Sequence, residues 1–383
     1  MVLPVRGAHA RGAVAVSAVG LFLLCFGLVH TWFWGSYQLV DWPTYQAYGD
    51  AIWNHGRVPY RDFAVEYPPG ALPVFVAAAP FDDYATAFAW LMAGCGALLV
   101  VACSFVRLEA AVYTALAPVL VGSLILSRFD LWPSLLLAVA LAALLAERHR
   151  LGWAFLGAAV AAKLWPLVVV PLALVWSIRR GRGWAALAGA AVVAAAFVPF
   201  LVLSPGGVWH MLSGQASRPL QIESLGAALF TTFGQPRVVS THGSQNVAGH
   251  GAVGALFSLA EAAVLVVLWV GFARGPADRE RFLRYTAAAA CAFVALNKVL
   301  SPQYLIWLIP LVAFVRGARG VAALALLTLA CVLTQVWFPH RYFAYVFTFH
   351  LAPVVLARDL VLVALLAVLA WPTRPARARP SSA

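Results

Sequence analysis

Apolar runs about as long as a membrane-spanning helix recur along the whole chain, and they constrain the fold more than any other feature. A helix that crosses a bilayer needs roughly 20 mostly apolar residues. About twelve runs approach that length: residues 14–34, 86–106, 110–126, 131–146, 151–164, 166–178, 184–203, 248–272, 285–299, 303–315, 321–338 and 352–371. The chain is 63% hydrophobic and 10% charged, which excludes an ordinary soluble protein. We therefore predict an all-α, polytopic integral membrane protein with one transmembrane domain, residues 1–383.

The basic residues predict how these helices are oriented. The chain has 26 Lys+Arg and 14 Asp+Glu, and its net charge of +12 could by itself indicate nucleic-acid binding. If the N-terminus is cytoplasmic, however, the alternating spans place seventeen of the 26 basic residues on the inner side, as the positive-inside rule requires. They are Arg6, Arg11, Arg107, Arg148, Arg150, Arg179, Arg180, Arg182, Arg274, Arg279, Arg281, Arg284, Arg316, Arg319, Arg374, Arg377 and Arg379. The excess charge then faces membrane lipids, both termini are expected in the cytoplasm, and nucleic-acid binding is not expected.

The same residues indicate the source of the chain. Only Lys163 and Lys298 are lysines, and such a preference for Arg in an Ala-, Gly- and Pro-rich chain is typical of a GC-rich bacterial genome. We therefore expect a bacterial inner or plasma membrane as the location of the protein.

Two long connections, residues 35–83 and 204–247, fall on the outer side. They are rich in aromatic, acidic, His, Pro and Gly residues, and long loops of this kind often carry function. In the first segment, Asp41 follows the first predicted span directly. Residues 43–56 could form an amphipathic helix at the membrane interface, anchored by Tyr45, Tyr48 and Trp53. Asp41 could equally cap that helix or face solvent.

Several short motifs along the chain resemble one enzyme family. The first outer segment contains Asp41-x-x-x-Tyr45, Gly56-x-x-x-Tyr60 and Tyr67-Pro68-Pro69, and later stretches are Ser127-Arg128-Phe129-Asp130, Ala162-Lys163-Leu164-Trp165-Pro166-Leu167 and Leu300-Ser301-Pro302-Gln303-Tyr304-Leu305-Ile306-Trp307. In this order they resemble the GT-C membrane glycosyltransferases, especially family 87, the polyprenol-phosphate-mannose-dependent type. The resemblance implies a GT-C-like fold and an inverting transfer in which Asp41 takes the proton from an acceptor hydroxyl.

The resemblance has one departure. Family members that make phosphatidylinositol mannosides carry a histidine pair shortly after Ser-Pro, where this chain has Gln303, Tyr304 and Leu305. The acceptor and the donor sugar therefore stay open.

The leaving lipid phosphate of such a reaction needs positive charge near it. Both lysines lie at outer helix ends, and Arg218, Arg128 and Arg358 are further outer candidates for binding the donor phosphate. The alternative for each of these side chains is that it only extends to the membrane interface.

A further set of residues is expected to bind substrate or to shape the loops. Arg128 and Asp130 could form a structural ion pair with each other or with the first outer segment, and Glu223 could orient a sugar hydroxyl or cap a short helix. The full set is Tyr45, Arg57, Tyr60, Glu66, Tyr67, Asp130, Glu223, Gln303 and Tyr304.

No cofactor is expected, and a divalent metal is left open without a motif that supports it. The five cysteines lie in apolar runs without CxxC pairs, the histidines have no metal-ligand spacing, and the first outer segment has no DxD pair.

The expected function is transfer of a sugar, with mannose favoured, from a polyprenyl-phosphate donor to a hydroxyl of a cell-envelope glycolipid, glycan or protein at the outer face. Glu261 supports an alternative, because an acid in the middle of a predicted span is typical of ion-coupled transport. That alternative is a transporter or flippase for a lipid-linked sugar or a small solute. No pair of interrupted helices in the two halves of the chain supports it.

Overall fold

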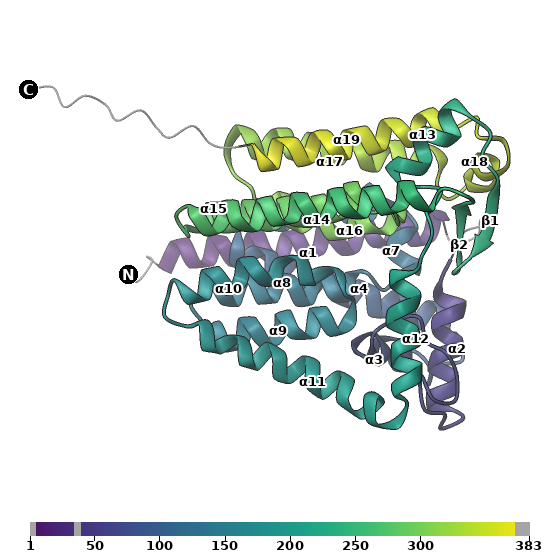
Figure 1. Ribbon diagram of the computed structural model, residues 1–383. Coiled ribbons are helices and arrows are strands. Elements are labelled where there is room, and N and C mark those ends of the chain that lie inside the picture. The colour runs from purple at the N-terminus through teal and green to yellow at the C-terminus, as the bar shows by residue number, and fades with distance from the viewer. Residues whose placement is uncertain (1–4, 34–39, 372–383) are drawn as a thin grey trace, which may run out of the picture.

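Long helices run side by side in the computed structural model, which describes residues 5–33 and 40–371 (Figure 1). The chain is 76% helical. Within the described residues, 6 helices are long and apolar enough to cross a membrane. They belong to α1 (Val5–Phe33), α4 (Tyr84–Val106), α11 (Ala186–Leu203), α14 (Gly251–Arg274), α17 (Gly317–Trp337) and α19 (Ala352–Ala370).

Shorter apolar helices fill the bundle between them. These are α8 (Leu131–Leu145), α9 (His149–Ala162), α10 (Val170–Ile178), α15 (Arg279–Leu296) and α16 (Leu305–Ala313). Short 3-10 turns lead into three helices: η2 (Trp165–Val169) into α10, η3 (Gly183–Ala185) into α11 and η4 (Pro302–Tyr304) into α16. Eleven of the twelve predicted runs thus coincide with single helices or with a helix and its leading turn.

The run at residues 110–126 does not form one spanning helix, so that expectation is wrong. It is divided into α5 (Leu108–Ala115), α6 (Ala117–Val121) and α7 (Leu124–Ser127). Pro118 cannot donate a backbone hydrogen bond, and Gly122 has a φ of 60°, which glycine adopts without strain. Both interruptions of the helix are therefore caused by residues within the run itself.

The centre of the bundle is α16. All nine of its residues are buried, and it packs against α5, α8, α15 and α17. A helix that is apolar on every face is stable only where protein surrounds it. This position brings the Trp307 side chain, from the first turn of α16, near the end of the bundle that carries the two long segments.

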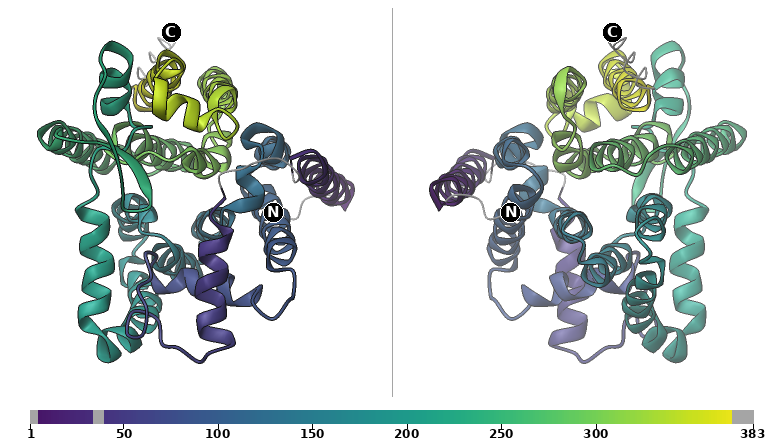
Figure 2. Two further views of the ribbon diagram at one scale, coloured as in Figure 1. Left: turned by 90° about the vertical axis from the view of Figure 1, so that its right-hand side faces the viewer. Right: turned by 90° about the vertical axis from the view of Figure 1, so that its left-hand side faces the viewer.

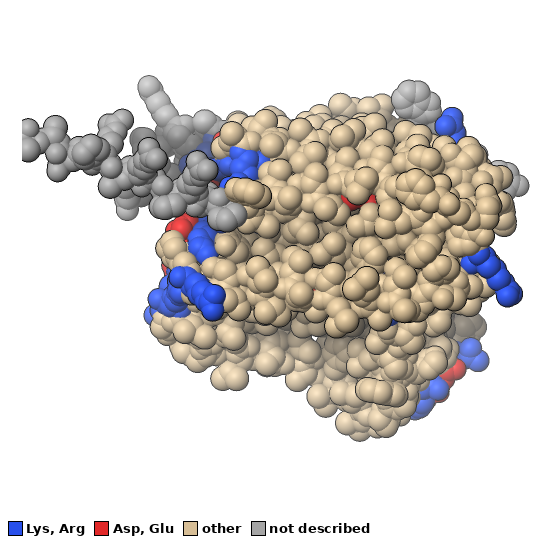
Figure 3. Space-filling view, turned by 45° about the horizontal axis from the view of Figure 1, so that its top comes forward, with Lys and Arg blue, Asp and Glu red and all other residues tan. Residues whose placement is uncertain are grey.

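The short basic connections lie at one end of the bundle, at the left of Figure 1. Ion pairs join them there, between Arg107 and Glu280 at 2.8 Å and between Arg180 and Glu147 at 2.9 Å. On the face drawn in Figure 3, Lys and Arg gather towards the two ends, and the band between them carries little charge. Arg374, Arg377 and Arg379 lie outside the described residues, as do residues 35–39 at the start of the first outer segment.

The two long segments form the opposite end. The first contains α2 (Trp42–Trp53), η1 (Pro69–Ala71) and α3 (Leu72–Ala77), and the second contains α12 (Pro205–Ala216), α13 (Leu225–Phe233) and a hairpin of β1 (Val238–Thr241) and β2 (Ser244–Val247). The short helix α18 (Tyr342–Thr348) lies at the same end of the bundle. Helices α2 and α12 run across the end of the bundle (Figure 2, left). The hairpin is antiparallel, with Val238 opposite Val247.

The predicted interfacial helix corresponds to α2, but Tyr45 is no interfacial anchor. Its side chain is 1% exposed and stacks on the Phe75 ring at 4.5 Å. Tyr45 therefore holds α2 against α3, because burial of a large aromatic ring stabilises that contact.

Candidate active site

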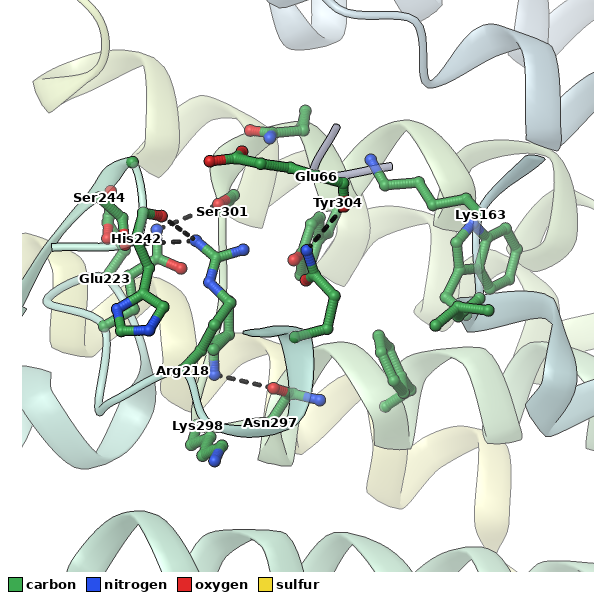
Figure 4. A pocket seen from close by; sticks show the side chains of 18 of the residues that line it. Glu66, Lys163, Arg218, Glu223, His242, Ser244, Asn297, Lys298, Ser301 and Tyr304 are labelled. Carbon is green, nitrogen blue, oxygen red and sulfur yellow. Dashed lines mark hydrogen bonds between the residues drawn. The ribbon is translucent and has the colours of Figure 1, made fainter. Parts of the chain in front are cut away.

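A cavity of about 1000 Å³ opens at the end of the bundle that carries the two long segments. Residues from separate segments between Val40 and Phe343 line it, and Figure 4 shows several of them. Its polar lining includes Asp41, Glu66, Tyr67, Arg128, Lys163, Gln215, Arg218, Gln221, Glu223, Ser258, Glu261, Asn297, Lys298, Ser301, Gln303 and Tyr304. Four carboxylates and four cations in this lining balance one another.

The first outer segment reaches the cavity because two glycines permit close backbone contacts. A Cβ at Gly70 would lie 2.7 Å or less from backbone atoms of Ala161 and Ala162, at the end of α9. A Cβ at Gly207 in α12 would collide with the Tyr60 carbonyl oxygen. Tyr60 also accepts a hydrogen bond on that oxygen from Ser204 Oγ at 2.9 Å. The segment is thus held between α9 and α12.

Asp41 lies at the N-terminal end of α2, but its side chain makes no capping hydrogen bond. It forms an ion pair with Arg128, and the Tyr45 hydroxyl donates to it at 3.4 Å. The Asp41 side chain is 33% exposed, whereas the Arg128 side chain is 8% exposed. The helix-cap alternative for Asp41 is therefore wrong, and the carboxylate faces the cavity beside a buried cation.

Lys163 is the second cation of this part of the cavity. Its Nζ donates to Asp130 Oδ1 at 2.6 Å, and Trp307 Nε1 donates to the same oxygen at 2.6 Å. Lys163 also lies 4.7 Å from the centroid of the Phe129 ring. Asp130 is fully buried and positions Lys163 without lining the cavity itself. Of the two ion pairs expected for Arg128, the structure has the one with the first outer segment, at Asp41, and not the one with Asp130.

Glu223 faces the cavity from a buried position between α12 and α13. It hydrogen-bonds Tyr342, and burial raises the pKa of its carboxyl to about 7. Nearby, Gln221 Nε2 donates to Ser301 Oγ at 3.0 Å. The segment that carries Glu223 is thereby joined to the start of η4.

Arg358 is not a phosphate ligand, contrary to the expectation from its place in the sequence. Its side chain is 0% exposed, pairs with Asp359 at 2.7 Å and donates to the Glu223 carbonyl oxygen at 2.8 Å. A guanidinium that lies wholly inside the protein and does not line the cavity cannot contact a substrate there. Arg358 instead supports the chain at Glu223.

The other predicted residues divide into two groups. Glu66, Tyr67, Gln303 and Tyr304 line the cavity, while Tyr60 shapes the loop by donating to the Tyr67 carbonyl oxygen at 2.6 Å. Arg57 is exposed and does not line the cavity, so the structure does not bring it to the site.

Arg218 lines the cavity and holds the hairpin turn. Its guanidinium donates to Ser244 Oγ at 3.2 Å and to the His242 carbonyl oxygen at 3.5 Å (Figure 4).

Sequence reasoning missed Glu261 and Asn297 as cavity residues. The Glu261 carboxylate lies near the Asn297 amide, and the Lys298 ammonium is the charge that acts on it. Lys298 Nζ donates to the Ala216 carbonyl oxygen at 2.9 Å. The sequence contained a signal for both residues, because Glu261 is an acid within an apolar run and Asn297 precedes one of the two lysines. The carboxylate that supported a transporter opens onto the same cavity as Asp41.

Within the described residues, no group of three or more His, Cys, Asp and Glu side chains is placed to hold a metal ion. The five cysteines are buried and unpaired with one another.

Comparison with known proteins gives a family and a fold. Residues 63–302 match the sequence profile of glycosyltransferase family 87. The fold is similar to that of ArnT from Cupriavidus metallidurans, whose crystal structure was determined bound to undecaprenyl phosphate. The TM-score is 0.51 at 16% identity, over 92% of this chain and 76% of that chain. No curated protein matches the chain.

Proposed function

Because the chain belongs to glycosyltransferase family 87, within the GT-C superfamily, we propose that it transfers a sugar from a polyprenyl-phosphate donor to a hydroxyl group of a cell-envelope acceptor. We further propose mannose as the sugar and a glycolipid, glycan or protein as the acceptor. The binding of undecaprenyl phosphate by ArnT, which shares the fold, supports a lipid-linked donor.

One observation carries this proposal: Asp41, Arg128 and Lys163 meet in one cavity, although they come from three distant parts of the chain. The reaction needs a base for the acceptor hydroxyl and positive charge for the leaving phosphate. Among the described residues of this part of the cavity, Asp41 is the one carboxylate that is both partly exposed and placed against a cation.

In the proposed reaction, the acceptor oxygen forms a bond to the anomeric carbon while the bond from that carbon to the phosphate oxygen breaks. Asp41 accepts the hydroxyl proton, and the electron pair of the broken bond stays on the polyprenyl phosphate. Arg128 and Lys163 stabilise the resulting charge. A guanidinium has five N–H donors, so Arg128 can bind a phosphate while it keeps its contact with Asp41.

The apolar part of the lining supports a donor that carries a lipid tail. Leu265, Val266 and Trp269 of α14 and Phe293 of α15 line the cavity below its polar end. Most of the spanning window of α14 is exposed, with 17% buried within the protein, so α14 separates the cavity from surrounding lipid.

We propose the following arrangement in the membrane. About twelve passes of the chain, one of which is divided into α5, α6 and α7, form one domain over residues 1–383, both termini are cytoplasmic, and the cavity opens on the outer face of a bacterial cell membrane. The gathering of short basic connections at the opposite end of the bundle supports this orientation (Figure 1).

The test uses purified protein in lipid with labelled polyprenyl-phosphate mannose and a cell-envelope extract as the source of acceptor. We expect Asp41→Asn to lower the transfer rate by about 10²–10⁴-fold, the usual contribution of a general base. Asp82→Asn is the matched control, because Asp82 is exposed in the same outer segment and does not line the cavity. Undiminished transfer by Asp41→Asn would exclude Asp41 as the base. Transfer from another polyprenyl-phosphate sugar, but not from the mannose donor, would exclude mannose.

A further inference from the structure

Helix α14 has one face that packs against the protein, and the chemistry of that face changes along its length. Ser258 and Glu261 line the cavity in the outer half, whereas Leu265 and Leu268 follow on the same face at helical spacing and are both buried. Glu261 lies about 15 Å from the start of the helix at a rise of 1.5 Å per residue. A helix that served only to close the bundle would carry apolar residues throughout this face.

The Glu261 carboxylate has a defined set of partners. Asn297 Oδ1 accepts a hydrogen bond from the Val299 backbone N–H at 2.8 Å, which leaves the amide nitrogen for Glu261. The Lys298 ammonium lies nearby and donates to Ala216 at the end of α12. Asn297 and Lys298 lie beside one another in Figure 4, with Lys163 towards the other side of the view.

This group is separate from the cations proposed to bind the donor phosphate. The charges that act on Arg128 include those of Asp130 and Glu223, whereas the charge that acts on Glu261 is that of Lys298, beside the uncharged Asn297 amide. A carboxylate repels a phosphate. Asp130, which pairs with Lys163, is buried and does not line the cavity, whereas Glu261 does, so a phosphate in the cavity is favoured beside Lys163 over Lys298. Lys298, which shares its surroundings with Glu261, is therefore better suited to another ligand.

The chemistry of this group suits an uncharged polyhydroxyl ligand. A carboxylate accepts hydrogen bonds from hydroxyl groups, while an ammonium and an amide N–H can donate to them. The Ser258 hydroxyl donates to the Gly254 carbonyl oxygen at 3.0 Å, and its oxygen can accept from a ligand hydroxyl. Trp269, two turns beyond Glu261 on α14, lines the same cavity, and it is held by a hydrogen bond from its Nε1 to the Val168 carbonyl oxygen at 2.9 Å. Aromatic faces of this kind can pack against the apolar face of a sugar ring.

We propose that Ser258, Glu261, Asn297 and Lys298 form the subsite that binds the acceptor, and that the acceptor presents there an uncharged sugar ring with neighbouring hydroxyl groups. The assignment to the acceptor rests on the proposed function, because the donor sugar is bonded directly to the phosphate and so must lie beside Arg128 and Lys163. The carboxylate within an apolar helix is thereby explained as a ligand-binding group.

The binding test uses n-octyl α-D-mannoside as an uncharged probe and dodecyl phosphate as an anionic probe, with tryptophan fluorescence as the readout. We expect Glu261→Gln to weaken octyl mannoside binding about 10- to 100-fold, the usual effect of losing hydrogen bonds to a charged group. Dodecyl phosphate binding should stay within twofold of the wild type in this variant, and should weaken in Lys163→Gln. Glu109→Gln is the matched control, because Glu109 is exposed on α5 and does not line the cavity.

Transfer assays give a second readout. With octyl mannoside as acceptor, Glu261→Gln should raise the acceptor KM about 10-fold or more and leave the donor KM within twofold. Ser258→Ala, which changes no charge, should raise the acceptor KM about 3- to 10-fold and provides the test if Glu261→Gln does not fold.

The outcomes distinguish this inference from the proposed function. If the wild type transfers no sugar but binds octyl mannoside in a Glu261-dependent way, the proposed function fails and the sugar subsite stands. If transfer depends on Asp41 while neither Glu261→Gln nor Ser258→Ala changes the acceptor KM, the subsite is refuted. It is also refuted if the wild type does not bind octyl mannoside, or if Glu261→Gln weakens dodecyl phosphate binding instead.

Discussion

Asp130 offers the sharpest test of how the site is held together. Its side chain is 1% exposed, and one of its oxygens accepts from both Lys163 and Trp307, each at 2.6 Å. In Asp130→Asn the Lys163 ammonium loses its counter-charge while it stays 15% exposed. Removing one partner of a buried ion pair costs about 3–5 kcal/mol. We expect the free energy of unfolding to fall by about 3 kcal/mol, because the cavity still gives Lys163 some access to water.

The same change should impair binding of the donor. Lys163 is proposed to contact the phosphate, and hydrogen bonds to charged groups contribute about 1.5–3 kcal/mol. A displaced ammonium should therefore raise the donor KM about 10- to 100-fold, since 1.4 kcal/mol corresponds to a factor of ten.

A double-mutant cycle with Lys163→Met separates these effects. Unfolding is followed by SDS titration in bicelles, and transfer is followed with the labelled donor. Asp130→Asn combined with Lys163→Met should recover about 2 kcal/mol or more of the stability lost in Asp130→Asn, because no unpaired cation remains buried. Activity should not recover. Simple additivity of the two stability changes would refute the argument that Asp130 serves to neutralise and position Lys163.

Three further predictions concern other parts of the structure. Burial raises the pKa of the Glu223 carboxyl from its ordinary value of 4.5 to about 7 in the folded protein. The folded state therefore binds more protons than the unfolded state between these pH values, and the free energy of unfolding should fall as pH rises from 4.5 to 7. Glu223→Gln should flatten this pH dependence in SDS titrations at a series of pH values. Arg358→Met should lower the free energy of unfolding by about 3 kcal/mol and leave the donor KM within twofold. Adding Asp359→Asn to this variant should restore part of the lost stability. A raised donor KM without destabilisation would instead show that Arg358 binds the donor phosphate. All five native cysteines are buried, so a cysteine introduced at the surface should be the one that reacts with an impermeant maleimide. Arg182→Cys should react only when the reagent is on the cytoplasmic side, and Asn54→Cys only when it is outside. The reverse pattern would show that the proposed topology is inverted.

Much of the fold follows from local properties of the chain. Eleven predicted runs became helices because length and apolar composition together favour a spanning or buried helix whatever its neighbours are. The exception at residues 110–126 also has a local cause, since Pro118 and Gly122 interrupt the helix within the run itself. The burial of Tyr45 was not local, because it depends on the Phe75 ring of a different helix.

For the site, the sequence by itself determined which chemical groups were available and, through the pattern of spans and basic residues, which end of the bundle would carry them. Asp41, Lys163 and Glu66 were placed at that end correctly. Only the tertiary structure decided which of these groups meet. Arg128 pairs with Asp41 and not with Asp130, two residues away, because extended backbone at Arg128 directs its side chain towards the first outer segment. Arg358 is wholly buried beside Asp359, and Glu261 faces the cavity, because the packing of α19 and α14 against their neighbours decides which face of each helix is covered. Spacing along a helix defines its faces, but what each face meets depends on segments distant in the sequence, such as Asp41 for Arg128 and Glu223 for Arg358, the latter two 135 residues apart.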